Sequence, residues 1–258
     1  MLQVDGASLN FASHGGYGPW VTLVNGHSRS MDDFKSMTQF LVELGFRVAT
    51  LDNRGSGKTT VTRPFYLKDM MTDVTSLWFH LGISQSHLIG ISMGGVIAQN
   101  IAAAYPGCVD SLVLVSTTCG KKWMSHTELD WGTDLNSVKK KLSYYVTPRF
   151  ISKNQLLFES MSKQILKSIE LSDFKDSGSM QTAAIGDYDT LAVMPEINSR
   201  TLVVHGSDDQ IINVGVVEDF KKHIGDVREV VFEEIGHLIL AENPRPFYQL
   251  VGSFLKEI

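Results

Sequence analysis

The segment Gly90–Gly94, which reads Gly-Ile-Ser-Met-Gly, contains the residue types that a nucleophilic serine needs. Apolar residues precede it and an alanine-rich helical stretch from Val96 to Tyr105 follows, so it lies between a predicted strand and a predicted helix. A sharp turn there would expose the hydroxyl of Ser92, and the two glycines would let neighbouring chain pass where a Cβ would clash. The backbone N–H of Met93 would point from the helix N-terminus toward a developing oxyanion. The segment therefore indicates acyl transfer; the alternative is a glycine-rich turn that only packs tightly.

A reactive serine needs a base, and the base needs an acid to fix its tautomer. Among the eight histidines, only His237 lies on a loop between the last predicted strand and the last predicted helix. Two carboxylates, Asp208 and Asp209, follow the apolar strand 201–205. Consecutive residues on an extended segment point in opposite directions, so both cannot face His237 without a bend. Geometry alone leaves the choice between them open.

A second oxyanion donor is expected at another strand end. His27 follows Gly26 directly after the apolar run Trp20–Val24. Its backbone N–H is predicted to complete the oxyanion hole with that of Met93. The imidazole of His27 is a less favoured candidate for contact with substrate.

Strands and helices alternate along most of the chain, which predicts a parallel sheet covered on both faces. Helical spacing is clearest from Met70 to Leu81, where Gly82 is expected to end the helix. The predicted strands are Leu9–Ala12, Trp20–Val24, Phe46–Leu51, His87–Ile91, Val109–Val115, Arg200–His205 and Val227–Phe232.

From Cys119 to Met180 the sequence has no buried-strand run, only polar segments and amphipathic helices. We predict that residues 119–180 form a helical lid inserted into a core domain of residues 1–118 and 181–258. The apolar stripe from Leu157 to Ile169 is expected to pack on the core domain. Trp123 and Trp131 in the lid, with Leu238 beside the histidine, are expected to contact substrate, although the aromatic residues could equally form a core within the lid.

Composition excludes several classes of protein. The net charge of -5 over 258 residues gives no electrostatic footprint for nucleic acid. No apolar stretch is long enough to span a membrane, and no signal peptide is evident, so no membrane partner is expected. Cys108 and Cys119 are the only cysteines and lack metal-ligand spacing, which favours a cytoplasmic protein with free thiols and no metal.

With these motifs in place, the chain resembles lid-bearing α/β-hydrolase-fold enzymes, similar to 3-oxoadipate enol-lactonases, proline iminopeptidases and cofactor-free haloperoxidase-like esterases. The resemblance rests on the turn at Gly90–Gly95, on Asp52–Gly57, on Gly206–Asp209 and on Gly236-His237. It implies an α/β fold with a mostly parallel eight-stranded sheet. It departs from the family at Asn25, where a histidine is usual; catalysis should be spared because the donor there is a backbone N–H.

The resemblance implies a catalytic triad of Ser92, His237 and Asp209, because the family spacing G-x-x-D selects Asp209 over Asp208. It also implies hydrolysis of a small ester, lactone or thioester without any cofactor, by a monomer or homodimer. Arg54 and Asp52 are expected to tie loops together. Asp208 is expected to accept backbone N–H groups of its own loop.

There are three alternatives to a serine hydrolase. A phosphate-binding loop ending at Gly57-Lys58-Thr59 is excluded because the pattern needs glycine where Asp52 stands. A ligand-binding receptor on the same fold, with little turnover, stays open because a fold does not fix a function. A haloperoxidase or perhydrolase activity, which would use the same three residues, also stays open.

Overall fold

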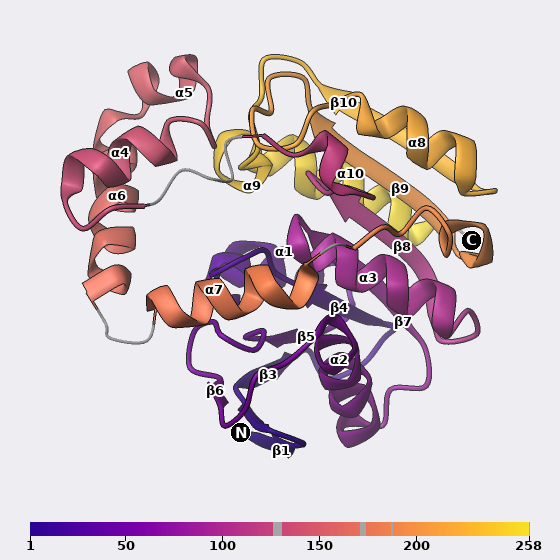
Figure 1. The fold of residues 1–258 in the computed structure, drawn as a ribbon. Coiled ribbons are helices and arrows are strands. Elements are labelled where there is room, and N and C mark those ends of the chain that lie inside the picture. The colour runs from indigo at the N-terminus through magenta and orange to yellow at the C-terminus, as the bar shows by residue number, and fades with distance from the viewer. Residues whose placement is uncertain (126–130, 171–173, 187, 258) are drawn as a thin grey trace.

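A central sheet of seven strands organises the computed structural model, which describes residues 1–125, 131–170, 174–186 and 188–257 (Figure 1). The strand order is β10-β9-β8-β7-β4-β5-β3; every pair is parallel except β3 with β5. The strands are β3 Phe11–His14, β4 Trp20–Val24, β5 Arg47–Leu51, β7 Ser86–Ile91, β8 Val109–Val115, β9 Arg200–Gly206 and β10 Val227–Phe232.

The expectation of eight strands in this sheet is wrong for the described chain, because the first two strands pair with each other and with β6 in a separate sheet. At Asn10, between the two sheets, the backbone N–H donates to Thr59 Oγ1, the side-chain amide donates to Asp52 Oδ2 and the carbonyl accepts the N–H of Asp52. The preceding residues form a separate small sheet in the order β1-β2-β6. Its strands are β1 Leu2–Val4, β2 Ala7–Leu9 and β6 Thr60–Val61.

Helices cover both faces of the main sheet and bury two separate apolar clusters. One face carries α2, α3 and α8, whose Val74, Ile97 and Phe220 are almost completely buried. The other face carries α1 and α10, which contribute Leu41 and Phe254. The helices are α1 Lys35–Glu43, α2 Leu67–Leu81, α3 Met93–Ala104, α8 Val216–His223, α9 Ile239–Glu242 and α10 Pro244–Lys256, with 3₁₀ turns at Met31–Phe34, Lys121–Trp123 and Met194–Glu196.

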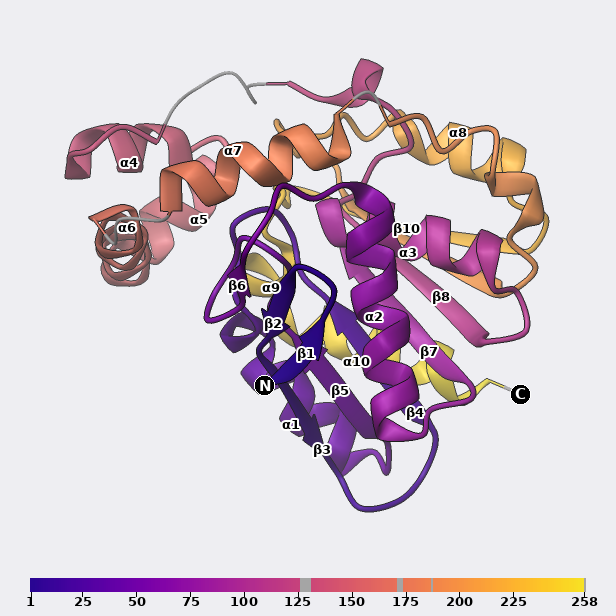
Figure 2. The ribbon, with the colours of Figure 1, turned by 60° about the horizontal axis from the view of Figure 1, so that its bottom comes forward.

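Four further helices lie between β8 and β9: α4 Leu135–Leu142, α5 Pro148–Lys153, α6 Gln155–Glu170 and α7 Phe174–Ile185. Figures 1 and 2 show α4, α5 and α6 gathered at one side of the core, while α7 runs back across it. The predicted end of the lid, residue 180, falls inside α7, which runs on to Ile185. The two ends of this helical segment meet where Gly120 bridges Asp189 and Thr190 N–H donates to the carbonyl of Cys119 (3.0 Å).

The helical segment has an apolar cluster of its own, which includes Val138, Phe150 and Ile165. The stripe on α6 packs into this cluster rather than onto the core domain, so that expectation is wrong, and Leu157 at its start is exposed. The reason is that α4 and α6 pack against each other. No helix within the described residues is long and apolar enough to cross a membrane.

Candidate active site

Ser92 lies at the turn between β7 and α3, in the conformation that its motif predicts. Its backbone has φ 53° and ψ −118°, a left-handed conformation that is strained for a residue with a Cβ. Two neighbours hold this turn: Ser92 N–H donates to the carbonyl of Val115 (2.9 Å), and Thr117 Oγ1 donates to the carbonyl of Ser92 (2.6 Å). The turn is therefore fixed by the end of the adjacent strand, β8.

The glycines on either side of Ser92 are required by space. A Cβ on Gly90 would overlap the carbonyl of Gly94, and a Cβ on Gly94 would overlap the carbonyl of Val24. Gly95, which the motif does not include, is equally restricted by the side chain of Thr117. Strand β4 thus passes directly beside the turn.

The three side chains expected to act together are in hydrogen-bonding distance. His237 Nε2 lies 3.2 Å from Ser92 Oγ, and His237 Nδ1 lies 2.8 Å from Asp209 Oδ2. Because a carboxylate only accepts, Nδ1 carries the proton and Nε2 is free to accept the serine proton. The imidazole and the carboxylate are both buried. This arrangement can activate a serine hydroxyl.

Asp209, rather than Asp208, faces the imidazole. Its second oxygen, Oδ1, accepts the backbone N–H groups of Ile211 and Ile212, each at 2.9 Å. Asp208 is exposed and accepts only the hydroxyl of Ser207 among the described contacts. The expectation that Asp208 holds the amides of its own loop is therefore wrong, because Asp209 turns inward and takes them.

The charge of Asp209 is stabilised despite its burial. Burial alone would raise the pKa of this carboxyl, but the nearby imidazoles outweigh it and hold the pKa well below its usual range. One of these imidazoles is His205, on β9, whose Nε2 lies 3.3 Å from Asp209 Oδ2 and 2.9 Å from the carbonyl of Ile212. Asp209 therefore remains an anion that can orient His237.

The expected oxyanion donors lie on both sides of Ser92. As the first residue of α3, Met93 has a backbone N–H without an acceptor inside the helix. On the other side, a Cβ on Gly26 would lie 3.3 Å from Ser92 Cβ, so the chain that leads into His27 passes against the serine. Gly26, the residue before His27, thus lies against Ser92, and the role of the two N–H groups stays a prediction.

The imidazole of His27 is directed to helix α7. Its Nε2 lies 2.9 Å from the carbonyl of Gly178 and 3.0 Å from Thr182 Oγ1, and its Nδ1 lies 3.1 Å from Ser28 Oγ. Burial lowers the pKa of His27, which favours the neutral ring, with Nε2 donating to the carbonyl of Gly178. The ring of His27 therefore bonds to α7 and to Ser28.

The residues expected to tie loops together do so. Asp52 accepts the backbone N–H groups of Met31 and Lys58. Arg54 forms a bidentate, almost completely buried ion pair with Asp73. Asn25, in place of the family histidine, donates its amide to the carbonyl of Ser30 and to Asp33 Oδ2, and accepts the N–H of Gly26.

Of the three residues expected to contact substrate, Leu238 is next to His237 in the chain and Trp131 is linked to His237 through the ring of Tyr145. Trp131 stacks on Tyr145 (5.5 Å between ring centroids), and Tyr145 meets the ring of His237 edge-on at 5.4 Å. Leu238 N–H donates to the carbonyl of Tyr145 (3.0 Å). Trp123 is instead held against α8, where its Nε1 donates to Asp219 Oδ2 (2.8 Å).

Two polar residues at this site, the half-buried Glu242 and the buried Gln181, were not predicted from the sequence. Glu242 accepts the N–H of Gly236 and both the N–H and the hydroxyl of Thr147. Gln181, on α7, contacts the loops that follow β4 and β5. The sequence around Gln181 and around Glu242 has no local pattern that predicts such distant partners.

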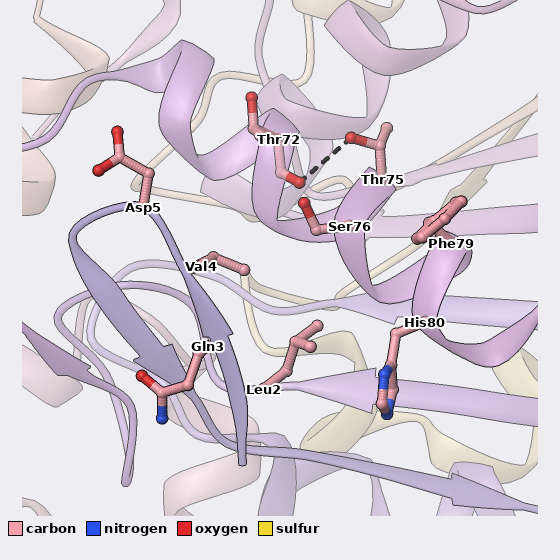
Figure 3. Close-up of a pocket in the computed structure, with 9 residues that line it drawn as sticks. All are labelled: Leu2, Gln3, Val4, Asp5, Thr72, Thr75, Ser76, Phe79 and His80. Carbon is pink, nitrogen blue, oxygen red and sulfur yellow. Dashed lines mark hydrogen bonds between the residues drawn. The ribbon is translucent and has the colours of Figure 1, made fainter.

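A groove of about 620 Å³ lies elsewhere, between β1 and α2 (Figure 3). Its lining includes Asp5, Thr72, Phe79 and His80, and none of the residues around Ser92. Among the described residues, no group of three His, Cys, Asp or Glu side chains could hold a metal ion. The residues with an arrangement suited to catalysis are therefore those at the turn.

Comparison with known proteins identifies the family of this chain. A model of the alpha/beta hydrolase fold family matches residues 14–244. The chain is 26% identical to 2-hydroxy-6-oxo-6-phenylhexa-2,4-dienoate hydrolase of Comamonas testosteroni, over 95% of this chain and 86% of that protein. It is also 26% identical to 3-oxoadipate enol-lactonase 1 of Acinetobacter baylyi, over 83% of this chain and 80% of that protein.

A solved structure of an alpha/beta hydrolase enzyme from a Medee basin deep-sea metagenome library superposes with a TM-score of 0.87. It is 20% identical in sequence, and the match covers 98% of this chain and 95% of that one. The protein belongs to the α/β-hydrolase-fold family. Its relatives named above are hydrolases, which supports hydrolase activity for this chain.

Proposed function

We propose that this protein is a serine hydrolase that cleaves a small carboxylic ester, lactone or thioester through an acyl-enzyme on Ser92. The observation that carries the proposal is the continuous contact from Ser92 Oγ through the imidazole of His237 to the carboxylate of Asp209. The similarity to an enol-lactonase supports an ester-type substrate.

In the proposed first half-reaction, Ser92 Oγ attacks the substrate carbonyl and passes its proton to His237 Nε2. Asp209 stabilises the imidazolium that forms, and the N–H groups of His27 and Met93 hold the oxyanion. The imidazolium then protonates the leaving alcohol or thiol. The products of this step are the acyl-Ser92 ester and the leaving alcohol or thiol, which for a lactone stays attached to the acyl chain.

In the second half-reaction, water takes the place of the leaving group. Neutral His237 removes a proton from the water, which attacks the acyl carbon. The tetrahedral intermediate collapses, His237 returns the proton to Ser92 Oγ, and the carboxylic acid leaves. None of these steps uses a cofactor.

The helical segment α4–α7 is proposed to act as the lid. The stacked pair Trp131 and Tyr145 supports this role, because it brings an apolar wall from the segment to the edge of His237. Leu238 extends that wall through its contact with Tyr145. A substrate with an apolar acyl or alcohol group fits such a wall best.

A fluorophosphonate probe and a panel of esters, lactones and thioesters test the proposal. Labelling is expected at Ser92, and Ser92→Ala should lower kcat by about 10⁴–10⁶. Ser116→Ala is a matched control, because Ser116 also has a left-handed backbone (φ 43°) but is not part of the proposed triad. Labelling at another residue, or activity retained in Ser92→Ala, would contradict the proposal; ligand binding without turnover would favour a receptor.

A further inference from the structure

Helix α7 makes close contact with the loop that carries the backbone N–H of His27. A Cβ on Gly178 would lie 3.2 Å from Ser28 Oγ and 3.5 Å from His27 Cε1, so a methyl group at this position would already touch the loop. The helix belongs to the proposed lid, whereas the loop follows β4 of the core sheet. This contact joins two parts of the chain that are remote in sequence.

Gln181 is the centre of this contact. It is fully buried, and its Oε1 accepts the backbone N–H of Ser28 at 2.6 Å. Its Nε2 donates to the carbonyl of Arg54 (2.6 Å) and to Ser56 Oγ (2.7 Å). One side chain of α7 therefore connects the loop after β4 to the loop after β5.

The loop needs such a contact because its backbone is strained. Ser28 has φ 56°, a left-handed conformation that a residue with a Cβ adopts only when its surroundings impose it. The residue before it, His27, is restrained by the same helix, because its ring contacts the carbonyl of Gly178 and the hydroxyl of Thr182. Two separate sets of contacts from α7 thus hold His27 at its ring and at the peptide bond that follows it.

We propose that Gln181 is a positioning residue for the oxyanion hole, so that the lid helix α7 completes the catalytic geometry as well as covering it. This inference rests on the proposed function, in which the N–H of His27 binds the oxyanion. An oxyanion donor acts only if it is held about 2.7–3.1 Å from the developing charge before the reaction. Gln181 holds the neighbouring peptide of Ser28 and so orients that donor without touching substrate.

The test compares Gln181→Leu with the wild type for hydrolysis of a p-nitrophenyl ester. Loss of a whole oxyanion donor costs about 10²–10³ in kcat, and a misplaced donor is expected to cost about 10–100-fold. The KM should stay within about threefold, because the oxyanion forms only in the transition state. Affinity for an alkyl boronic acid, which forms a tetrahedral adduct with the serine, should fall in parallel with kcat.

Gln99→Leu is the matched control. Gln99 is also a fully buried glutamine on a helix, and it also bonds two distant loop groups, the carbonyl of Thr118 and the hydroxyl of Thr190. If a general loss of stability lowers kcat, both variants will show it equally. A fall in kcat and in boronic acid affinity confined to Gln181→Leu supports the proposal.

Thr182→Val is the second variant, used if Gln181→Leu does not fold. It removes the exposed hydroxyl contact to His27 Nε2 and leaves the contact to Gly178, so a fall in kcat of about threefold to tenfold is expected. Equal kcat in Gln181→Leu and Gln99→Leu, or in Thr182→Val and wild type, overturns the inference. If wild-type Ser92 is labelled by the probe in that case, only the role of α7 fails; if it is not labelled, the proposed function fails.

Discussion

The carboxylate of Glu242 joins the loop of His237 to Thr147, the residue that caps the N-terminus of α5. One oxygen accepts the N–H of Gly236 at 2.9 Å, and the other accepts the hydroxyl of Thr147 at 2.6 Å. The helical segment is therefore attached to the core at two different places beside the candidate site. Glu242 holds the loop of His237, and Gln181 holds the loop of His27.

Glu242→Gln is expected to reduce both stability and kcat. A glutamine has one acceptor oxygen in place of two, so a buried donor loses its partner at a cost of about 1–3 kcal/mol. Burial raises the pKa of Glu242 above its ordinary value. The folded protein therefore binds this proton more tightly than the unfolded chain, and its contribution to the free energy of unfolding declines as pH rises through the folded-state pKa.

Urea denaturation between pH 4 and pH 8 measures this effect. In the wild type, Glu242 should make the free energy of unfolding decline with rising pH above about pH 4.5. In the variant, this part of the decline should be absent. The exposed Glu43→Gln serves as control and should behave as the wild type. An unchanged pH dependence in Glu242→Gln would contradict the assignment.

Asp209→Asn is expected to lower kcat by about 10⁴, the scale reported for the same change in another Ser–His–Asp site. The amide can hold His237 in the wrong tautomer, and it no longer stabilises the imidazolium. Asp208→Asn is the adjacent control; since Asp208 is exposed, its effects on kcat and on Tm should be small. Steady-state kinetics of both variants measure kcat. A larger loss of kcat in Asp208→Asn than in Asp209→Asn would assign the role of the acid to Asp208.

Trp131→Ala is expected to change substrate preference, because Trp131 stacks on the ring that meets His237. The ratio of kcat/KM between a hexanoyl and an acetyl p-nitrophenyl ester should fall by about 10-fold, since loss of apolar contact costs about 1–3 kcal/mol. Labelling of Ser92 should persist. Trp123→Ala should leave the ratio unchanged and reduce Tm, since Trp123 is bonded to Asp219 on α8; equal ratios in both variants would refute the proposed wall.

Asp73→Asn is expected to lower the free energy of unfolding by about 3–5 kcal/mol, because it leaves the buried guanidinium of Arg54 without its counter-charge. Glu218→Gln removes one partner of the exposed ion pair with Lys221 and should cost no more than about 1 kcal/mol. Urea unfolding at neutral pH measures both. Similar costs for the two variants would show that the pair at Arg54 is not as isolated from water as its burial indicates.

The sequence predicted those parts of the fold that depend on local pattern. Apolar runs such as Val109–Val115 and Val227–Phe232 became strands with the expected bounds, and Gly82 ends α2 in a left-handed conformation. The break at Asn10 was not predicted, because it depends on bonds to Thr59 and Asp52 that lie far along the chain. Local periodicity carries no information about such partners.

The same distinction holds for the site. Ser92 and His237 could be predicted because a motif and a strand end mark each of them, and the structure places them in contact. The choice between Asp208 and Asp209 needed a family spacing, since it depends on which carboxylate turns inward. Gln181 was missed because its partners Ser28 and Arg54 lie more than 120 residues before it.

The bridge between Gly120 and Asp189 has a consequence for the entropy of the chain. The helical segment leaves the core and returns to it at neighbouring residues, so its two ends are held together. The entropic cost of closing such a loop grows only with the logarithm of its length, by about 0.6 kcal/mol for each doubling. Residues can therefore be added to or removed from the parts of the segment that make no contact with the core at little cost to the folding of the sheet.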